Sequence, residues 1–232
     1  MGTIFILIGL IIWPVFNRPA EAQNQELQQR VAELKQGAAK NKMALAQYTW
    51  MQQVSIILKG EQKKQEHFQV RIGPDGTQQK TSLDPQEAAP PSGGRLKQHV
   101  VAKKKEEYTD YADSMKALAQ QYVPPTQELL QQAYVGGNIT LGTVAGNPSE
   151  AQFVIHNYLK PQDTMTLIYD RAQKVLIGLT IATYMDDPKD AMNLSVQFTR
   201  LPDGSNQVSG LTLNGVSKQL TIVIANSNYQ HL

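Results

Sequence analysis

Histidine, the residue used most often for acid–base catalysis and metal binding, is scattered along this sequence. The four histidines, His67, His99, His156 and His231, fall in different predicted elements, and none stands four residues from another. A zinc site brings together three or four protein ligands, often at short spacings along the chain. No carboxylate lies at such a spacing from these histidines. We therefore expect neither a metal site nor a catalytic histidine.

Three carboxylates and one arginine are the next groups that could do chemistry. The segment Asp186-Asp187-Pro188-Lys189-Asp190 clusters its acids, but a calcium site needs more oxygen ligands and usually a glycine at the bend. The segment instead predicts a loop with a helix start after Pro188. Arg71 lies between Val70 and Ile72, and it is either a solvated side chain or an arginine that points into a cavity.

Composition excludes several classes of protein. Phosphate-cradling loops, zinc-protease motifs, serine elbows and EF-hand loops are missing from the sequence. The formal net charge of +2, from 22 Lys and Arg against 20 Asp and Glu, is too small to indicate nucleic acid as a partner. Because there is no cysteine, there are no disulfides, no cysteine metal sites and no lipid-bearing cysteine. We expect a protein that is not an enzyme and has no cofactor.

The amino terminus indicates export. The run Ile4–Phe16 is apolar but shorter than the about 20 residues that span a bilayer. A small-x-small cleavage site, Ala20-Glu21-Ala22, follows it. We therefore expect residues 1–22 to be a signal peptide cleaved after Ala22, and the protein to be periplasmic or secreted. Because Met-Gly-Thr supplies no Lys or Arg, an uncleaved anchor is the alternative.

The first part of the mature chain combines a helix with a small β region. Apolar residues at helical spacing predict an amphipathic helix from Gln25 to about Gln47. The period then changes to two, which predicts strands over Tyr48–Lys59 and around Phe68–Ile72. A polar run over Thr77–Leu83 suits an edge strand. The Pro- and Gly-rich segment Asp84–Gly94 reads as a linker.

A helical pair is inserted after this linker. Apolar residues recur every three to four positions from Arg95 to Gln121 and predict one long amphipathic helix. Pro124-Pro125 ends it, and a shorter helix runs from Thr126 to about Tyr134. The run Lys103–Glu107 reads as a solvated helix face, with a lipid-binding basic patch as the alternative. Residues 95–137 therefore form an insertion between two β regions.

From Asn138 the chain is β to its end. Strands are predicted over Ala151–Leu159, Thr164–Asp170, Val175–Tyr184 and Met192–Leu201, and a final run over Val208–Asn228 is broken by a loop. In the third of these, Val175, Ile177, Leu179 and Ile181 are expected to share one face. The pattern predicts an α+β fold in which a curved antiparallel sheet, an unclosed β-barrel, carries the N-terminal helix and the inserted helical pair.

Large apolar side chains on the predicted inward faces are the candidate site. Core packing is the ordinary role of such residues. A curved sheet with helices on one side only can also leave an apolar hollow that holds an acyl chain. The candidate cavity-lining residues are Trp50, Val54, Phe68, Val70, Tyr111, Met115, Phe153, Leu167, Leu179 and Phe198. Whether the concave face is a cavity or a filled core stays open.

The order of these elements resembles the lipoprotein localisation factors of the LolA/LolB type. The likeness rests on the export signal, the N-terminal helix, the first strand with Tyr48-Thr49-Trp50, the inserted helices and the long β meander. It covers most of residues 25–232 and is one of layout. In that family an unclosed antiparallel barrel is capped by helices, and an apolar cavity carries the acyl chains of lipoproteins. The resemblance implies a single half-barrel domain over residues 23–232.

We therefore expect an exported binding protein, monomeric, that holds a lipid or lipoprotein acyl chain in an apolar cleft. The alternative is a structural or regulatory envelope domain whose core is filled and whose sheet binds another envelope protein. Lipid extracted from the purified protein would favour the first expectation.

Overall fold

The structure is a computed structural model that describes residues 40–41, 43–85, 95–123, 125–173 and 175–232. The predicted signal peptide, residues 1–22, and most of the predicted helix over 25–47 lie outside the described residues. The described part of that helix, residues 40–41 and 43–45, is helical.

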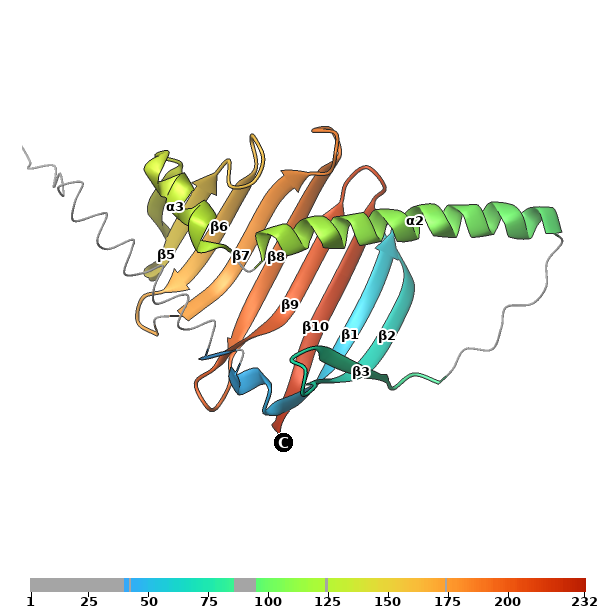
Figure 1. The fold of residues 1–232 in the computed structure, drawn as a ribbon, viewed down its shortest axis with the longest axis horizontal. Helices are drawn as coiled ribbons and strands as arrows, with labels where there is room; N and C mark the ends of the chain where they lie inside the picture. The colour runs from blue at the N-terminus through green and yellow to red at the C-terminus, as the bar shows by residue number, and fades with distance from the viewer. Residues whose placement is uncertain (1–39, 42, 86–94, 124, 174) are drawn as a thin grey trace, which may run out of the picture.

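Ten strands form one antiparallel sheet in the order β3-β2-β1-β10-β9-β8-β7-β6-β5-β4 (Figure 1). The strands are β1 (Tyr48–Leu58), β2 (Glu61–Ile72), β3 (Gln78–Ser82), β4 (Ile139–Val144), β5 (Asn147–His156), β6 (Thr164–Asp170), β7 (Val175–Tyr184), β8 (Ala191–Arg200), β9 (Asn206–Gly215) and β10 (Leu220–His231). The sheet does not close into a barrel, so β3 and β4 are its two edges. Most neighbouring strands in the sheet are also consecutive in the chain and form hairpins. The exception is the pairing of β1 with β10, which joins β1–β3 to β4–β10.

Two helices are inserted between β3 and β4. They are α2 (Arg95–Tyr122) and α3 (Gln127–Val135). The Thr126 hydroxyl caps α3 by accepting a hydrogen bond from the Leu129 backbone N–H at 3.3 Å. Figure 1 shows α2 crossing the strands, with its first turns extending past the β1 side of the sheet, and α3 lying near β5 and β6. The predicted fold class, a curved open antiparallel sheet with a helical insertion, is confirmed.

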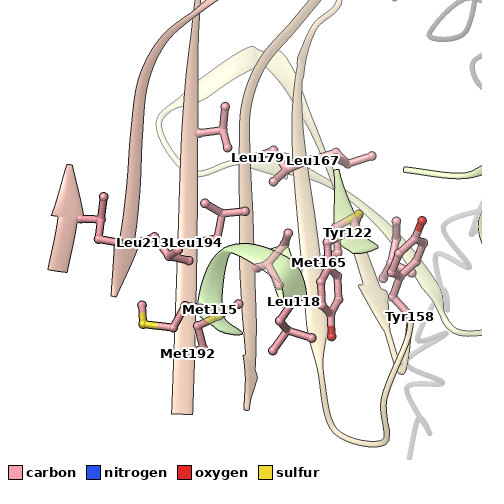
Figure 2. Close-up of a cluster of buried hydrophobic side chains, with 14 of the residues drawn as sticks. Met115, Leu118, Tyr122, Tyr158, Met165, Leu167, Leu179, Met192, Leu194 and Leu213 are labelled. Carbon is pink, nitrogen blue, oxygen red and sulfur yellow. The ribbon is translucent and has the colours of Figure 1, made fainter. Parts of the chain in front are cut away.

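The sheet has one apolar face and one polar face. On the apolar face, side chains of six strands pack beneath α2 into a common core, which Figure 2 shows around Met115, Leu118 and Tyr122. The opposite face presents mainly threonine, serine, asparagine and glutamine from the same strands. Alternation along each strand produces this division, because successive side chains of a strand point to opposite faces. We call the two surfaces the apolar face and the polar face.

A β-bulge corrects one sequence prediction. Ile168 lies opposite Gly178, but Tyr169 lies opposite Leu176, so one residue of β7 is left without a partner on β6. Leu176 packs on the core in place of Ile177. Val175 lies opposite Asp170 on the polar face. The prediction that Val175 and Ile177 share one face with Leu179 and Ile181 is therefore wrong. A single extra residue reverses the faces of the side chains before it relative to those after it, and the sequence gives no signal for its position.

A second correction concerns the acidic segment. The chain makes a turn at Asp187 and does not start a helix after Pro188. The Asp187 carboxylate accepts a hydrogen bond from the Lys189 backbone N–H at 2.9 Å, and the Asp187 carbonyl accepts one from Asp190 N–H at 2.8 Å. β8 begins at the next residue, Ala191. Pro188 therefore lies in a tight loop that connects β7 to β8.

Candidate functional site

All ten predicted cavity residues lie on the apolar face of the sheet or on the helix that covers it. Trp50 of β1 stands opposite Val70 of β2. Phe153, Leu167 and Leu179 stand opposite one another across β5, β6 and β7. The structure therefore brings the predicted set together on one surface.

Burial divides this set into two groups of five. Trp50, Val70, Met115, Leu167 and Leu179 are buried, and Val70 and Met115 have no exposed surface. The half-buried group is Val54, Phe68, Tyr111, Phe153 and Phe198. The first group serves as core, and the second borders solvent.

Helix α2 is held at one end of the apolar face by close packing. A Cβ at Gly215 of β9 would lie 2.6 Å from the Tyr111 hydroxyl oxygen and 2.7 Å from the Met115 sulfur. These distances are shorter than van der Waals contact, so a side chain at position 215 would force the ends of Tyr111 and Met115 to move. Tyr111 also donates a hydrogen bond to the Asp190 carboxylate at 2.7 Å. Lys218 forms an ion pair with Glu107 one turn earlier in the helix.

The carboxyl-terminal end of α2 is fixed by a buried polar cluster. The Tyr122 hydroxyl donates to the Asp163 carboxylate at 2.7 Å and lies 2.8 Å from the Thr183 hydroxyl. Asp163 also accepts the backbone N–H groups of Tyr158, at 2.6 Å, and of the two residues after it. Burial raises the pKa of Tyr122, and the neighbouring Asp163 carboxylate raises it further. The phenol therefore stays a protonated donor.

One row of apolar side chains crosses almost the entire sheet. The cross-strand register places one member from each of eight adjacent strands side by side. The row is Val54, Ile224, Leu211, Val196, Leu179, Leu167, Phe153 and Leu141. At about 4.8 Å between strands, its seven intervals extend roughly 34 Å, which is close to the thickness of the hydrocarbon core of a bilayer. We call this set the apolar row.

Burial varies along the apolar row. Val196, Leu179 and Leu167 in its middle are buried. Toward β1 the row becomes half-buried at Ile224 and Val54. Toward β4 it ends at Leu141, which is 54% exposed. The row thus extends outward from the core to β1 on one side and to the edge strand β4 on the other.

A chain of polar groups borders the β1 end of this row. The Lys80 ammonium donates to the Gln52 carbonyl at 2.7 Å, and the Gln52 amide donates to the Asn226 carbonyl at 3.0 Å. The Asn226 amide donates to the backbone carbonyl of Val208 at 3.0 Å. Gln52 is the only one of these side chains that is buried. We call Lys80, Gln52 and Asn226 the polar chain.

Lys80 is the cation of the polar chain, and its hydrogen-bond partner is neutral. Its side chain is exposed along β3, and its ammonium lies 5.8 Å from the centre of the Phe68 ring. Local burial of the ammonium lowers the pKa of Lys80, and the positive charge of Lys116 on α2 lowers it further. Within the described ranges of the chain, no carboxylate forms an ion pair with Lys80.

Beyond the polar chain, two aromatic side chains, Trp50 and Tyr229, pack together at the start of β1. The Trp50 and Tyr229 rings stack with their centroids 5.7 Å apart. Burial raises the pKa of Tyr229 to about 12, and its hydroxyl donates to the Val208 carbonyl at 2.7 Å. The Trp50 indole N–H is buried and has no hydrogen-bond acceptor among the residues that the structure describes. Such an unsatisfied donor is uncommon, because its desolvation costs about 1–3 kcal/mol.

A hollow of about 350 Å³ lies over the other side of the sheet, between β6 and β9. Side chains of the polar face line it, among them Thr166, Thr180, Ser195 and Thr212. None of the ten predicted residues lines this hollow. It is therefore separate from the apolar row.

His67 and Arg71, two residues whose types could serve in catalysis, are hydrogen-bonded to neighbouring side chains. His67 bonds to Asp84 through its ring nitrogen at 2.9 Å and through its backbone N–H at 2.6 Å. Arg71 is exposed and donates to the Gln79 side chain at 3.0 Å. In the described part of the chain, no group of three histidine, aspartate or glutamate side chains is placed to hold a metal ion. None of the helices described there has both the length and the hydropathy that crossing a bilayer requires.

Sequence reasoning missed the polar chain and the extent of the apolar row. A signal for the first exists, since Gln52 interrupts the apolar stripe of β1 between Trp50 and Val54. The row depends on the register between strands, which no local pattern specifies.

Comparison of the chain with family models, with curated proteins and with solved structures finds no match. The site must therefore be interpreted from its own chemistry.

Proposed function

We propose that this protein is an exported, non-enzymatic binding protein that holds the acyl chain of a lipid or lipoprotein along the apolar row. The observation that carries the proposal is the row itself, with one apolar side chain from each of eight strands and half-buried members near both ends. A linear apolar surface of this length matches a linear apolar ligand better than a compact one.

Binding of this kind is reversible and involves no covalent step. Each methylene group that leaves water contributes about 0.8 kcal/mol, so a chain of several methylenes supplies useful affinity without any directional contact. The half-buried members Val54, Ile224 and Leu211 form the accessible stretch, since they stand opposite one another on β1, β10 and β9. The ligand contacts this stretch first.

The polar chain supports a ligand with a polar or anionic end. Lys80 carries a positive charge beside the accessible stretch, and its partner Gln52 does not neutralise that charge. An ammonium with a neutral partner can gain a charge-assisted hydrogen bond from a carboxylate or phosphate. The ligand therefore lies with its acyl chain on Val54 and Ile224 and its anionic end toward Lys80.

The resemblance to the LolA/LolB type supports the same function. An open antiparallel sheet with helices over its apolar face is the layout in which that family carries acyl chains. The predicted signal peptide over residues 1–22 supports a periplasmic or secreted location, where such a carrier acts.

A protein-interaction domain with a filled core is the second candidate. It is favoured by the middle of the apolar row, where Val196, Leu179 and Leu167 are at most 4% exposed. If the row is core along its whole length, the sheet serves as a scaffold and its ligand is another envelope protein.

Lipid analysis of the purified protein separates the two candidates. Organic extraction and mass spectrometry should yield a bound lipid, and the emptied protein should bind a fluorescent fatty acid. Ile224→Ser should weaken this binding by about tenfold, because it removes apolar contact worth roughly 1–2 kcal/mol. Val223→Ser is the matched control, since Val223 is also half-buried but lies on the opposite face of β10. A protein that is lipid-free and binds no fatty acid would rule out the carrier function.

A second arm tests the role of Lys80. Lys80→Gln should weaken binding of a fatty acid and leave binding of its methyl ester unchanged, because only the acid is an anion. For the native protein, affinity for the acid should be complete between the pKa of the fatty-acid carboxyl group and the lowered pKa of Lys80. It should fall as pH rises through that value toward 10.5, where the ammonium loses its proton. Equal effects on acid and ester would show that Lys80 contributes by packing alone.

A further inference from the structure

The two edges of the sheet differ in charge. Edge strand β3 is entirely polar and has Lys80 at its centre. Edge strand β4, with the sequence ITLGTV, carries no charge and no proline. Natural sheets usually protect an exposed edge with lysine, proline or a covering element. Among the described residues, none pairs with the outer side of β4.

The register shows which backbone groups of β4 point outward. His156 N–H donates to the Asn138 carbonyl at 2.9 Å, and Ile139 lies opposite Ile155. In an antiparallel ladder, alternate residues direct both their N–H and C=O to the same neighbour. Thr140 and Gly142 therefore bond to β5, as Asn138 does. The outward residues of β4 are Ile139, Leu141 and Thr143.

Two of the most exposed apolar side chains lie at this edge. Leu141, the middle outward residue, is 54% exposed on the apolar face. Val135, the last residue of α3, is 76% exposed and precedes β4 by a short turn. Apolar side chains beside unpaired backbone groups favour an added strand over solvent.

We infer that β4 is the surface through which two copies of this chain pair, with Leu141 of one copy opposite Leu141 of the other. The three outward residues are symmetric about Leu141, so an antiparallel two-fold pairing places Ile139 opposite Thr143 of the second copy. This arrangement satisfies all six outward N–H and C=O groups of each strand. It replaces the monomer that the sequence led us to expect.

The pairing also makes one surface from two apolar faces. A two-fold axis at Leu141 is perpendicular to the sheet, so both apolar faces lie on the same side. The apolar row ends at Leu141, and it continues directly into the row of the second copy.

The same construction fails at β3, and this failure explains why β4 is the edge used. Leu83 N–H donates to the His67 carbonyl at 2.9 Å, which directs Thr81 toward β2 and leaves Lys80 as the central outward residue. Two-fold pairing of β3 would set two Lys80 side chains against each other. Like charges directly opposite each other destabilise paired strands. The uncharged β4 has no such repulsion.

Disulfide trapping tests both the pairing and its register, because the chain has no cysteine of its own. Leu141→Cys should form a covalent dimer on mild oxidation. Directly opposite residues have Cα atoms about 5.5 Å apart, within the range that a disulfide bridges. Thr143→Cys is the matched control on the same face. Its two copies would lie four residues apart along the pair, roughly 13 Å, and should not crosslink.

Sedimentation of the purified protein supplies the second readout. The native protein should be a dimer, and Leu141→Lys should raise its dissociation constant by about tenfold or more through repulsion across the axis. Thr140→Lys, whose side chain lies on the polar face, should leave the dimer intact. Circular dichroism confirms that each variant is folded. A native protein that stays monomeric at all concentrations, or equal crosslinking at positions 141 and 143, would overturn the inference.

Discussion

The two ends of the apolar face differ in how completely their polar groups are bonded. At the end beside β6 and β7, Tyr122, Asp163 and Thr183 bond to one another and fix the carboxyl-terminal end of α2. At the β1 end, the Trp50 N–H has no acceptor in the described residues, and Lys80 rests on a neutral amide. Saturated bonding makes a region rigid, whereas unfilled donors leave capacity for a ligand. We therefore expect the end with Tyr122 and Asp163 to maintain the fold, and the β1 end to bind the ligand.

The largest effect on stability should come from removing the Asp163 carboxylate, which is the shared acceptor of the buried polar cluster. Asp163→Ala deprives Tyr122 and three backbone N–H groups of their acceptor. Leaving buried donors unsatisfied should lower the free energy of unfolding by about 3–5 kcal/mol, measured by urea denaturation.

Asp170 provides a matched control for the loss of stability in Asp163→Ala. Asp170→Ala removes a carboxylate that accepts two backbone N–H groups in an exposed turn. It should cost much less, because water can replace the lost acceptor. Equal losses for the two variants would show that the buried cluster has no special role.

The next effect compares a fully buried position of the apolar face with a half-buried one. Met115→Ala opens a cavity at a fully buried position and should cost about 2–5 kcal/mol of stability. Phe198→Ala, at a half-buried position, should cost less stability but reduce binding of a fluorescent fatty acid more than Met115→Ala does. Thermal unfolding and fluorescence titration of both variants measure the two quantities. If binding falls in proportion to stability in both variants, the buried and the half-buried positions do not differ in role.

The smallest effect on stability should come from removing the Trp50 indole N–H, the buried donor without an acceptor among the described residues. Trp50→Phe removes the indole N–H and keeps an aromatic ring to stack on Tyr229. The relief of about 1–3 kcal/mol of desolvation should offset the smaller ring, leaving the free energy of unfolding within about 1 kcal/mol of the native value. Urea denaturation checks this outcome. A much larger loss would indicate that the N–H has a bonded partner in solution.

Much of this architecture follows from local patterns in the sequence. Alternation and helical spacing predict the strands, the helix from Arg95 and the common face of the ten candidate residues. They do not predict that Val54 stands opposite Ile224, because this register depends on residues far apart in the chain. Nor do they predict the bulge that selects Leu176, or the Tyr111–Asp190 hydrogen bond, since both depend on the assembled sheet.

The pairing of β1 with β10 has a consequence for folding kinetics. Gln52 and Asn226, which bond across this pair, are 174 residues apart in the sequence. The hairpins from β4 to β9 need only local chain, but β1, β2 and β3 can join the sheet only after β10 has been made. Long-range pairing of this kind is slow, because a large loop must close before any contact forms. We expect a late folding step that docks the first three strands, and a chain cut before Leu220 should leave them detached.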